Sequence, residues 1–481
     1  MTRSDISTIL PTVLLVAWAC ALLLVDLFIP RGRKGWTAFL AAVGLAGALG
    51  VTLAQAGQEL FAFSGMVVLD GFSSFLNVVF LASGLLAIAI AYGYLKRMGL
   101  ERGEYYILML FSISGMLLMA QAADLIVTFL ALELLSIPLY VLAAFARPRA
   151  DSEEAGIKYF LLGAFATGFV VYGITLVFGA TGATALSGIA AAVAAGTFTR
   201  YLLLIGAALI LVGFSFKVAA VPFHMWTPDV YQGAPTSVTG FMAVGAKTAG
   251  FAALLRIFVT ALPSLDVDLV PVLWGLAALT MVVGNVVAIS QTNIKRLLAY
   301  SSIAHAGYIL MAFVAFGNPK VAPDAVASAL FYLVTYAITS FGAWAAVIAL
   351  EKPEGKGLEI TDFAGLGRTR PLLAAALTVF MLSLTGMPPT LGLVGKFYLF
   401  RTAIQGGFIG LAIIGVLTSL VSAYYYLRVV VMMYMRDGDP ETAHEPWLDL
   451  TWGLTALATV VLSFVPMALF AWASGAVFKL F

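Results

Sequence analysis

Cysteine is almost absent from this sequence, which contains only Cys20 among 481 residues. One cysteine excludes an internal disulfide, and it excludes an iron–sulfur cluster held by this chain alone, which takes about four cysteine ligands. Histidine is nearly as scarce, and none of the three stands at a spacing typical of a metal site. No glycine-rich dinucleotide fingerprint follows a strand pattern. The sequence therefore offers no redox centre of its own.

Charged residues are also few, at 10% of the chain, whereas a soluble domain is about a quarter charged. Hydrophobic residues make up 62%, and the mean hydropathy is +1.03. Most of the surface must therefore face lipid. The net charge of +2 comes with no basic patch, so nucleic acid is not an expected partner.

The apolar runs are long and do not alternate with a period of two, which excludes a β-barrel and favours helices. A spanning helix needs about 20 mostly apolar residues. The sequence predicts an all-α polytopic membrane protein, one membrane domain over 1–481, with about fourteen spans. These spans are 6–29, 36–55, 71–94, 105–121, 124–145, 154–179, 201–230, 236–261, 269–290, 294–316, 324–350, 371–404, 407–435 and 447–478.

Basic residues are unevenly distributed between the two sets of alternate connections. One set holds Arg31, Arg33, Lys34, Lys96, Arg97, Arg102, Arg147, Arg149, Lys295, Arg296, Lys352, Lys356, Arg368, Arg370, Arg428 and Arg436. The other holds only Arg3, Arg200, Arg256, Lys320, Arg401 and Lys479. Because cytoplasmic loops carry the excess of lysine and arginine, we expect the first set in the cytoplasm and both termini on the opposite side.

Two spans, 201–230 and 371–404, are too long and too rich in proline for straight helices. The first contains Pro222 and Pro228, and the second contains Pro388 and Pro389. Each is the fourth span of a five-span block, spans 4–8 and spans 9–13. An odd number of spans gives the blocks opposite topology, and inverted repeats with matching broken helices are typical of transporters.

We therefore divide the chain into four parts. They are three N-terminal spans (1–104), a first repeat (105–261), a second repeat (269–435) and a C-terminal span (447–478). Proline can also kink a helix without functional consequence. A kink alone, however, does not require a lysine beside both breaks.

Four lysines, Lys158, Lys217, Lys247 and Lys396, fall within or at the edge of apolar runs. A lysine at the bilayer centre costs roughly 3 kcal/mol on insertion scales, so such residues usually mark an ion or proton path. Glu133 stands about nine residues into its span, or roughly 14 Å deep. A Glu133–Lys217 pair could exchange a proton as its spacing changes, although a fixed structural ion pair would read the same way.

The other polar residues at depth are less specific. Glu154 and Lys158 are four residues apart near one end of a span, where an ordinary ion pair is nearly as good an interpretation as a proton-uptake role. His224 follows Pro222 closely, and His305 lies ten residues after Lys295. Histidine shuttles protons near neutral pH, yet a lone histidine in an apolar setting is often a satisfied core residue.

Three segments carry a family resemblance: FHMWTPDVYQGAPTSVTGFMAVGAKTAG, SQTNIKRLLAYSSIAHAGY and LSLTGMPPTLGLVGKFYLF. They resemble the antiporter-like membrane subunits of respiratory complex I, NADH-quinone oxidoreductase, and within these the subunit N group. The similarity runs over most of 100–435. Subunits L and M should have a WLPDA-like run where this chain has Trp226-Thr227-Pro228-Asp229-Val230, and the lateral helix of L is absent.

The resemblance implies a proton-translocating subunit in the inner membrane, driven by quinone reduction elsewhere. FMN, iron–sulfur clusters and quinone would be held by partner chains, and subunits M and K would be neighbours. Glu133 and Lys217 would be the paired residues of the first repeat, Lys247 the central lysine and Lys396 the exit lysine, with His224 and His305 between them. Two alternatives remain open: a subunit of a multi-subunit Na+/H+ antiporter, or a structural subunit that does not pump.

Overall fold

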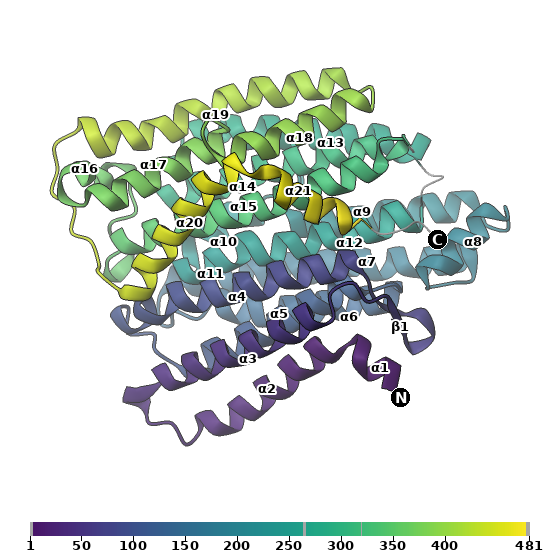
Figure 1. Cartoon of the computed structure of the whole chain (residues 1–481), viewed down its shortest axis with the longest axis horizontal. Coiled ribbons are helices and arrows are strands. Elements are labelled where there is room, and N and C mark those ends of the chain that lie inside the picture. Colours follow the sequence, from purple (N-terminus) through teal and green to yellow (C-terminus); the bar gives the residue numbers. More distant parts are fainter. Residues whose placement is uncertain (1–2, 263–265, 319, 478–481) are drawn as a thin grey trace.

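The computed structural model describes residues 3–262, 266–318 and 320–477, which form a bundle of long helices running side by side (Figure 1). Among the described residues, twelve helices are long and apolar enough to cross a membrane. Two shorter apolar helices, Leu10–Asp26 and Pro371–Thr385, belong to the same bundle. The prediction of an all-α polytopic membrane protein is confirmed at this level.

The N-terminal part contains four helices and a small hairpin. Its elements are α1 (Arg3–Thr8), α2 (Leu10–Asp26), η1 (Arg31–Arg33), α3 (Gly35–Ala54), β1 (Leu60–Ala62), η2 (Phe63–Gly65), β2 (Val67–Leu69) and α4 (Gly71–Arg97). The strands β1 and β2 pair antiparallel, with Phe61 opposite Val68. This hairpin was not predicted from the sequence.

The middle part contains the first broken helix. Its elements are α5 (Gly103–Gln121), α6 (Leu125–Ala143), α7 (Ala150–Thr181), α8 (Leu186–Ala194), α9 (Arg200–Val218), α10 (Trp226–Gly233), α11 (Thr236–Phe241), the π-helical turn η3 (Met242–Ala246) and α12 (Lys247–Thr260). α11, η3 and α12 form one continuous, wholly buried rod. The π-turn within this rod was not predicted from the sequence.

The C-terminal part contains the second broken helix. Its elements are α13 (Asp266–Ile289), α14 (Ile294–Val314), η5 (Ala315–Gly317), α15 (Ala322–Leu350), η6 (Pro353–Gly355), η7 (Ile360–Phe363), α16 (Leu366–Thr369), α17 (Pro371–Thr385), α18 (Leu391–Gln405), α19 (Ile409–Met435), α20 (Pro446–Phe464) and α21 (Pro466–Gly475). Almost all residues of α14 and α15 are buried, whereas only a minority of the residues of α7 and α20 are buried.

Both predicted helix breaks are confirmed. α9 stops at Val218 because Ala219 takes a left-handed backbone conformation with φ of 62°. α17 stops at Thr385, where Gly386 has φ of 89°. A left-handed residue ends a helix because the next N–H groups turn back to the last carbonyls. Each break is therefore a short non-helical segment inside the bundle.

The C-terminal prediction of a single span over 447–478 is wrong. α20 ends at Phe464, and α21 begins at Pro466 after the non-helical Val465. Proline has no N–H to donate and its ring clashes with the preceding turn, so the helix is interrupted there. Residue 478 of the predicted span lies outside the described residues, as does Lys479.

A buried ion pair fixes the rod that carries Lys247. Arg256 of α12 contacts the Asp70 carboxylate at 2.5 Å and donates a second bond to the carbonyl oxygen of Ala120 at 2.6 Å. Asp70 also caps α4 by accepting from the backbone N–H of Ser73. The Arg256 side chain thus connects α12 to the start of α4 and to α5.

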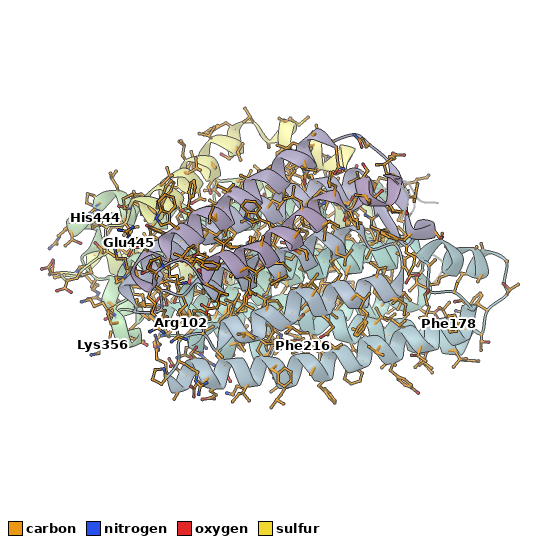
Figure 2. The ribbon with its side chains drawn as sticks, turned by 90° about the horizontal axis from the view of Figure 1, so that it is seen from below. Arg102, Phe178, Phe216, Lys356, His444 and Glu445 are labelled. Atoms are coloured by element: carbon orange, nitrogen blue, oxygen red, sulfur yellow. The ribbon has the colours of Figure 1, made fainter. Side chains whose placement is uncertain are left out.

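Polar loops gather at one end of the bundle. Figure 2 shows Arg102, Lys356, His444 and Glu445 at that end and Phe178 at the other. This is the end where the larger set of basic residues was expected. In Figure 1 it is the side of α16, while α1 lies at the opposite end.

Candidate functional site

Lys217 lies in the last turn of α9, directly before the first break, and is only 3% exposed. Its ammonium donates to Ser136 Oγ at 2.8 Å and to the Tyr159 hydroxyl at 3.2 Å. Both partners are neutral. No described residue forms an ion pair with Lys217, so the predicted Glu133–Lys217 ion pair is not made in this structure.

Glu133 nevertheless lies close to this lysine along α6. Ser136, which binds Lys217, is three residues after Glu133 and shares its helix face. Glu133 itself is half-buried and accepts a 2.8 Å hydrogen bond from Thr167 of α7. The carboxylate and the ammonium are thus held one helical turn apart, each by a hydroxyl.

Lys247 begins α12 and is likewise 3% exposed. It donates to Ser302 Oγ of α14 at 2.6 Å, and its ammonium lies 5.7 Å from the centre of the Tyr231 ring. An aromatic stack leads from here to Lys217: Tyr231 meets Trp226 edge-on, and Trp226 stacks on Tyr159 at 4.6 Å. The two lysines are therefore joined by packed rings.

Lys396 lies in α18, beyond the second break, and is again 3% exposed. It donates to the Thr385 carbonyl oxygen and to Ser419 Oγ, each at 2.8 Å. Its ammonium lies 4.5 Å from the centre of the Tyr308 ring. Ser419 is only half-buried, so this end of the lysine series approaches the surface of the chain.

His305 connects the central lysine to the last one. Its Nδ1 lies 2.6 Å from the Tyr332 hydroxyl and its Nε2 lies 3.2 Å from the Tyr426 hydroxyl. Ser302 lies one turn before it on α14, and Tyr308 lies one turn after it. Ser419 donates to Tyr308 at 3.2 Å and also accepts from Lys396. One face of α14 thus links Lys247 to Lys396 through polar groups.

His224 lies in the first break itself, between α9 and α10. It is half-buried, and within the described part of the chain its buried Nδ1 has no hydrogen-bond partner. A histidine nitrogen left unsatisfied beside a helix break can take up a proton or a water. The structure does not bring His224 into hydrogen-bond contact with Lys217 or Lys247.

Lys158 and Glu154 are at the surface. Lys158 bonds both Glu154 and Asp229 at 2.7 Å, and Asp229 also bonds Arg296 at 2.9 Å. The Lys158 side chain is 41% exposed. Exposed ion pairs of this kind contribute little energy. The geometry favours the ordinary interpretation of the Glu154–Lys158 pair over a role in proton uptake.

Sequence reasoning missed a buried pair at the basic end of the bundle, Lys295 and Glu351. Lys295 is 2% exposed and donates to the Ala234 carbonyl oxygen at 2.7 Å. Glu351 is 3% exposed and accepts from the Tyr94 hydroxyl at 3.3 Å, while its other oxygen has no partner among the described residues. The Tyr94 hydroxyl in turn accepts from the backbone N–H of Thr236. Both ionisable groups therefore hold the turn between α10 and α11.

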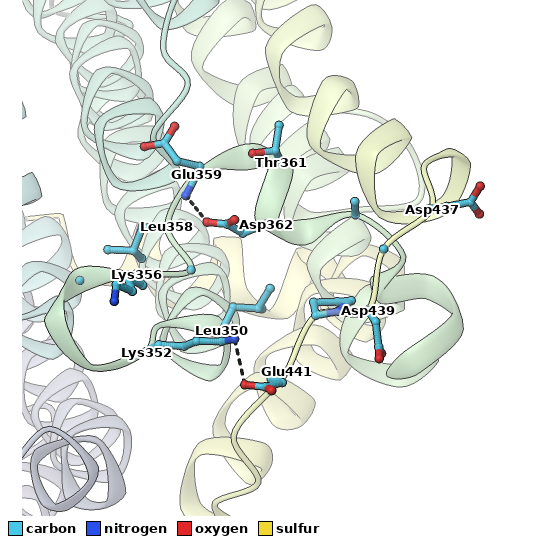
Figure 3. A pocket seen from close by; sticks show the side chains of 15 residues that line it. Leu350, Lys352, Lys356, Leu358, Glu359, Thr361, Asp362, Asp437, Asp439 and Glu441 are labelled. Carbon is cyan, nitrogen blue, oxygen red and sulfur yellow. Dashed lines mark hydrogen bonds and ion pairs between the residues drawn. The ribbon is translucent and has the colours of Figure 1, made fainter.

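A surface groove of about 710 Å³ lies between the 351–370 and 436–445 connections, as Figure 3 shows. Its charged groups bind one another: Lys352 pairs with Glu441 at 2.9 Å, and Asp362 accepts from the Glu359 backbone N–H. These bonds hold the loops together. None of Lys217, Lys247 and Lys396 lines this groove.

The arrangement as a whole is a series of buried amines separated by hydroxyls, rings and one imidazole. Hydroxyl groups both donate and accept, so they can pass a proton between neighbours without themselves becoming ions. A lysine without a carboxylate partner in an apolar interior can gain or lose its proton at modest cost. No cluster of three or more His, Cys, Asp or Glu side chains that could hold a metal occurs within the described residues.

Known sequences are similar to this chain over nearly its whole length. Residues 122–422 match the family described as NADH:quinone oxidoreductase/Mrp antiporter, TM. NADH-quinone oxidoreductase subunit N of Trichlorobacter lovleyi is 49% identical over 458 residues, covering 95% of this chain and 92% of that protein. The subunit N of Chloroflexus aggregans is 48% identical and covers 97% and 96%.

Solved structures agree. A chain of respiratory complex I from Thermus thermophilus is 37% identical, with a TM-score of 0.82 over 97% of this chain and all of that chain. A chain of the Mrp complex from a Dietzia species has a TM-score of 0.85, covering 99% of this chain and 97% of that one, at 20% identity. The second likeness shows a shared fold alone.

Proposed function

This chain belongs to the NADH-quinone oxidoreductase subunit N family, and we propose that its buried lysine series moves protons across the membrane within that enzyme. Three lysines at 3% exposure, Lys217, Lys247 and Lys396, are bonded, among the residues that the structure describes, only to hydroxyl and carbonyl oxygens. This single observation carries the proposal, because ionisable residues inside a membrane are costly and mark ion or proton paths, and no described acid forms an ion pair with these lysines.

The proposed order follows the contacts. A change in the charge of Glu133 alters the field at Lys217, since a hydroxyl on the next turn of α6 holds that lysine. Lys217 and Lys247 are joined by the Tyr159, Trp226 and Tyr231 rings. From Lys247 the path runs along α14 through Ser302 and His305 and ends at Lys396 and Ser419. His224 supplies a protonation site at the first break.

Protons would be taken up at the basic end through Lys295 and Glu351 rather than Lys158. Lys295 and Ser302 are seven residues apart on α14, so they share a face about 10 Å apart along the axis. Ser302 already binds Lys247. The buried pair therefore leads directly to the central lysine, whereas Lys158 is held in a surface network.

The fold supports a finer division as part of this proposal. Twelve long apolar helices and two shorter ones would make fourteen spans. The two breaks would occupy matching places in repeats 105–261 and 269–435, preceded by 1–104 and followed by a C-terminal part whose long helix is α20. The basic end would face the cytoplasm and both termini the periplasm, in a bacterial inner membrane.

The redox chemistry would lie on other chains. FMN, iron–sulfur clusters and quinone are expected on partner subunits, because this sequence has one cysteine and it is exposed. Neighbouring membrane subunits such as M and K would flank this one. Quinone reduction would deliver an electrostatic change along the membrane arm, and moving one charge against 100 mV takes about 2.3 kcal/mol.

The test is to replace Lys217 or Lys247 by Ala in the assembled enzyme and measure protons pumped per NADH oxidised in proteoliposomes. We expect the assembly to form and the ratio to fall. Normal pumping in an intact assembly would refute the relay and leave the non-pumping structural subunit. A Na+/H+ antiporter subunit would instead purify without NADH-oxidising partners.

A further inference from the structure

A second feature of the chain, independent of the lysine series, is an apolar groove on the outer surface of the bundle. It has a volume of about 450 Å³ and runs between α3, α4 and α20. The residues that line it include Gly35, Ala38, Ile88, Ala89, Tyr92 and Trp447. Gly35 leaves room here, since a Cβ on it would lie 3.0 Å from the Tyr92 ring.

The end of the groove at Gly35, Tyr92 and Trp447 is its mouth, and three cations lie within four residues of Gly35 or Tyr92 along the chain. Arg31 and Arg33 form the turn immediately before Gly35, and Lys96 lies one helical turn after Tyr92 on the same face of α4. All three side chains are exposed, and no described residue forms an ion pair with them.

The neighbouring acids are already engaged. Asp26 bonds Lys34 at 2.6 Å, and Glu445 bonds Arg97 at 2.8 Å. Glu101 and Glu104 belong to the turn into α5 and line no part of the groove. The mouth therefore has three positive charges that form no ion pair within the described part of the chain.

Aromatic residues near the mouth of the groove indicate its level in the bilayer. Trp36, Tyr92 and Trp447 are 59%, 42% and 54% exposed. Tryptophan and tyrosine concentrate at the level of lipid headgroups, because their rings are apolar on one side and carry a polar group on the other. An apolar groove that ends in aromatics and cations matches the shape of a phospholipid, with its acyl chain within the bilayer and its phosphate at the surface.

We propose that this groove is a binding site for an anionic phospholipid, with an acyl chain against Ala38, Ile88 and Ala89 and the headgroup held by Arg31, Arg33 and Lys96. Basic pockets between transmembrane helices hold anionic headgroups, and each nearby lysine or arginine favours an anionic over a neutral lipid by roughly fivefold. A zwitterionic lipid would fill the groove equally well but gain little from the three cations.

The test uses the assembled enzyme in phosphatidylcholine nanodiscs that contain a trace of lipid with a photoactivatable acyl chain. Phosphatidylglycerol and phosphatidylcholine versions are compared, and the cross-linked peptides are located by mass spectrometry. We expect the anionic probe to label the α3, α4 and α20 peptides at least fivefold more than the neutral probe. The substitutions R31Q, R33Q and K96Q together should remove that preference.

Two further variants distinguish lipid binding by the apolar groove from attraction to any exposed cation. Ala89→Phe fills the groove and should lower labelling by both probes, whereas Arg436→Gln, an exposed cation away from the lining, should change neither. Equal labelling by the two probes, or a preference that survives the triple substitution, would overturn the proposal. Cross-links absent from these peptides would also overturn it, because a neighbouring subunit would then cover the groove.

Discussion

Lys396 donates a 2.8 Å hydrogen bond to the carbonyl oxygen of Thr385, the last residue of the helix on the other side of the second break. The break thus provides a hydrogen-bond acceptor for Lys396, because ending α17 at Thr385 leaves a carbonyl without an intrahelical partner. A carbonyl oxygen only accepts, whereas Ser419 Oγ accepts from Lys396 and donates to the Tyr308 hydroxyl, so of these two partners only Ser419 could pass on a proton.

Replacing Lys396 by Met should therefore leave assembly intact and slow coupled proton transfer by roughly 10²-fold, the contribution of one positioned proton-transfer group. Proton uptake by proteoliposomes during NADH oxidation measures it. The exposed Lys320, far along the chain from any relay residue, provides the control: Lys320→Met should pump normally. Equal loss in both variants would point to a general defect.

Removing the hydroxyl of Ser302 should disturb Lys247, since Ser302 is the hydrogen-bond partner found for that ammonium among the described residues. A hydrogen bond to a charged group contributes about 1.5–3 kcal/mol. We expect Ser302→Ala to slow pumping by roughly tenfold or more and Ser302→Thr, which keeps the hydroxyl, to restore much of it. A Thr variant as slow as the Ala variant would argue against a hydroxyl relay.

Gly250 allows α12 to approach Lys217 closely. A Cβ added there would meet Val218 Cγ1 at 2.9 Å and Lys217 Cγ at 3.3 Å. Gly250→Ala should shift the lysine from Ser136 and reduce pumping while NADH oxidation by the assembly persists. Gly275→Ala is the matched control, because a Cβ on that helical glycine meets nothing within 4 Å. It should pump normally, and helix stability should rise by up to about 1 kcal/mol.

Stability should depend on acid pH through Asp70. Burial alone would raise the pKa of this carboxyl, but the charge and hydrogen bonds of Arg256, with those of Ser73, outweigh burial and hold the pKa below its usual 3.8. A depressed folded-state pKa means that the stabilisation is complete above 3.8 and is lost as pH falls through the lower folded value.

Thermal unfolding of the purified assembly between pH 3 and pH 6, a range of about one unit either side of ordinary carboxyl pKa values, measures this. Asp70→Asn keeps a good helix cap but removes the charge, so it should unfold earlier at pH 6 and lose less on acidification than the parent. Parallel pH curves for the two would contradict the assignment.

Replacing the buried Glu351 should reduce proton pumping more than replacing an exposed acid near it. Glu351→Gln removes the charge next to Lys295 and should slow proton uptake, with the loss growing as pH rises and protons become scarce. Glu359→Gln alters a neighbouring acid that is exposed and lies at the start of η7. The pH profile of pumping compares them, and identical profiles would exclude Glu351 from the uptake path.

Much of the site could be predicted because a lysine in an apolar run is costly in any membrane fold. Lys217, Lys247 and Lys396 were all found this way, and all three are buried. The breaks were predictable because Pro222 and Pro388 stand in runs too long for one helix, and Ala219 and Gly386 do end helices there. Pro466 is the same kind of signal, a proline within a long apolar run, and the helix is interrupted there as well.

The ligands of the lysines could not be predicted. Ser136, Ser302 and Ser419 look like any serine in a membrane helix, and only packing selects which serine faces an ammonium. Lys295 was assigned to a basic connection, and its burial arises because α14 starts beneath the α10–α11 turn. The partners of Glu133 and Lys217 also depend on sub-ångström helix placement, which decides between an ion pair and two hydroxyl contacts.

The π-turn at Met242–Ala246 sets the phase of the rod that contains Lys247. A π-turn winds one extra residue into a turn, so everything after it is rotated by about 100° relative to an unbroken α-helix. With that rotation, α11 can meet the end of α10 while Lys247 points at Ser302. Rewinding this turn into an ordinary α-helical turn would rotate Lys247 and the rest of α12 by about 100° relative to α11, so the ammonium would point away from Ser302. The π-turn thus lies directly before the one lysine of this rod and sets the direction in which that lysine points.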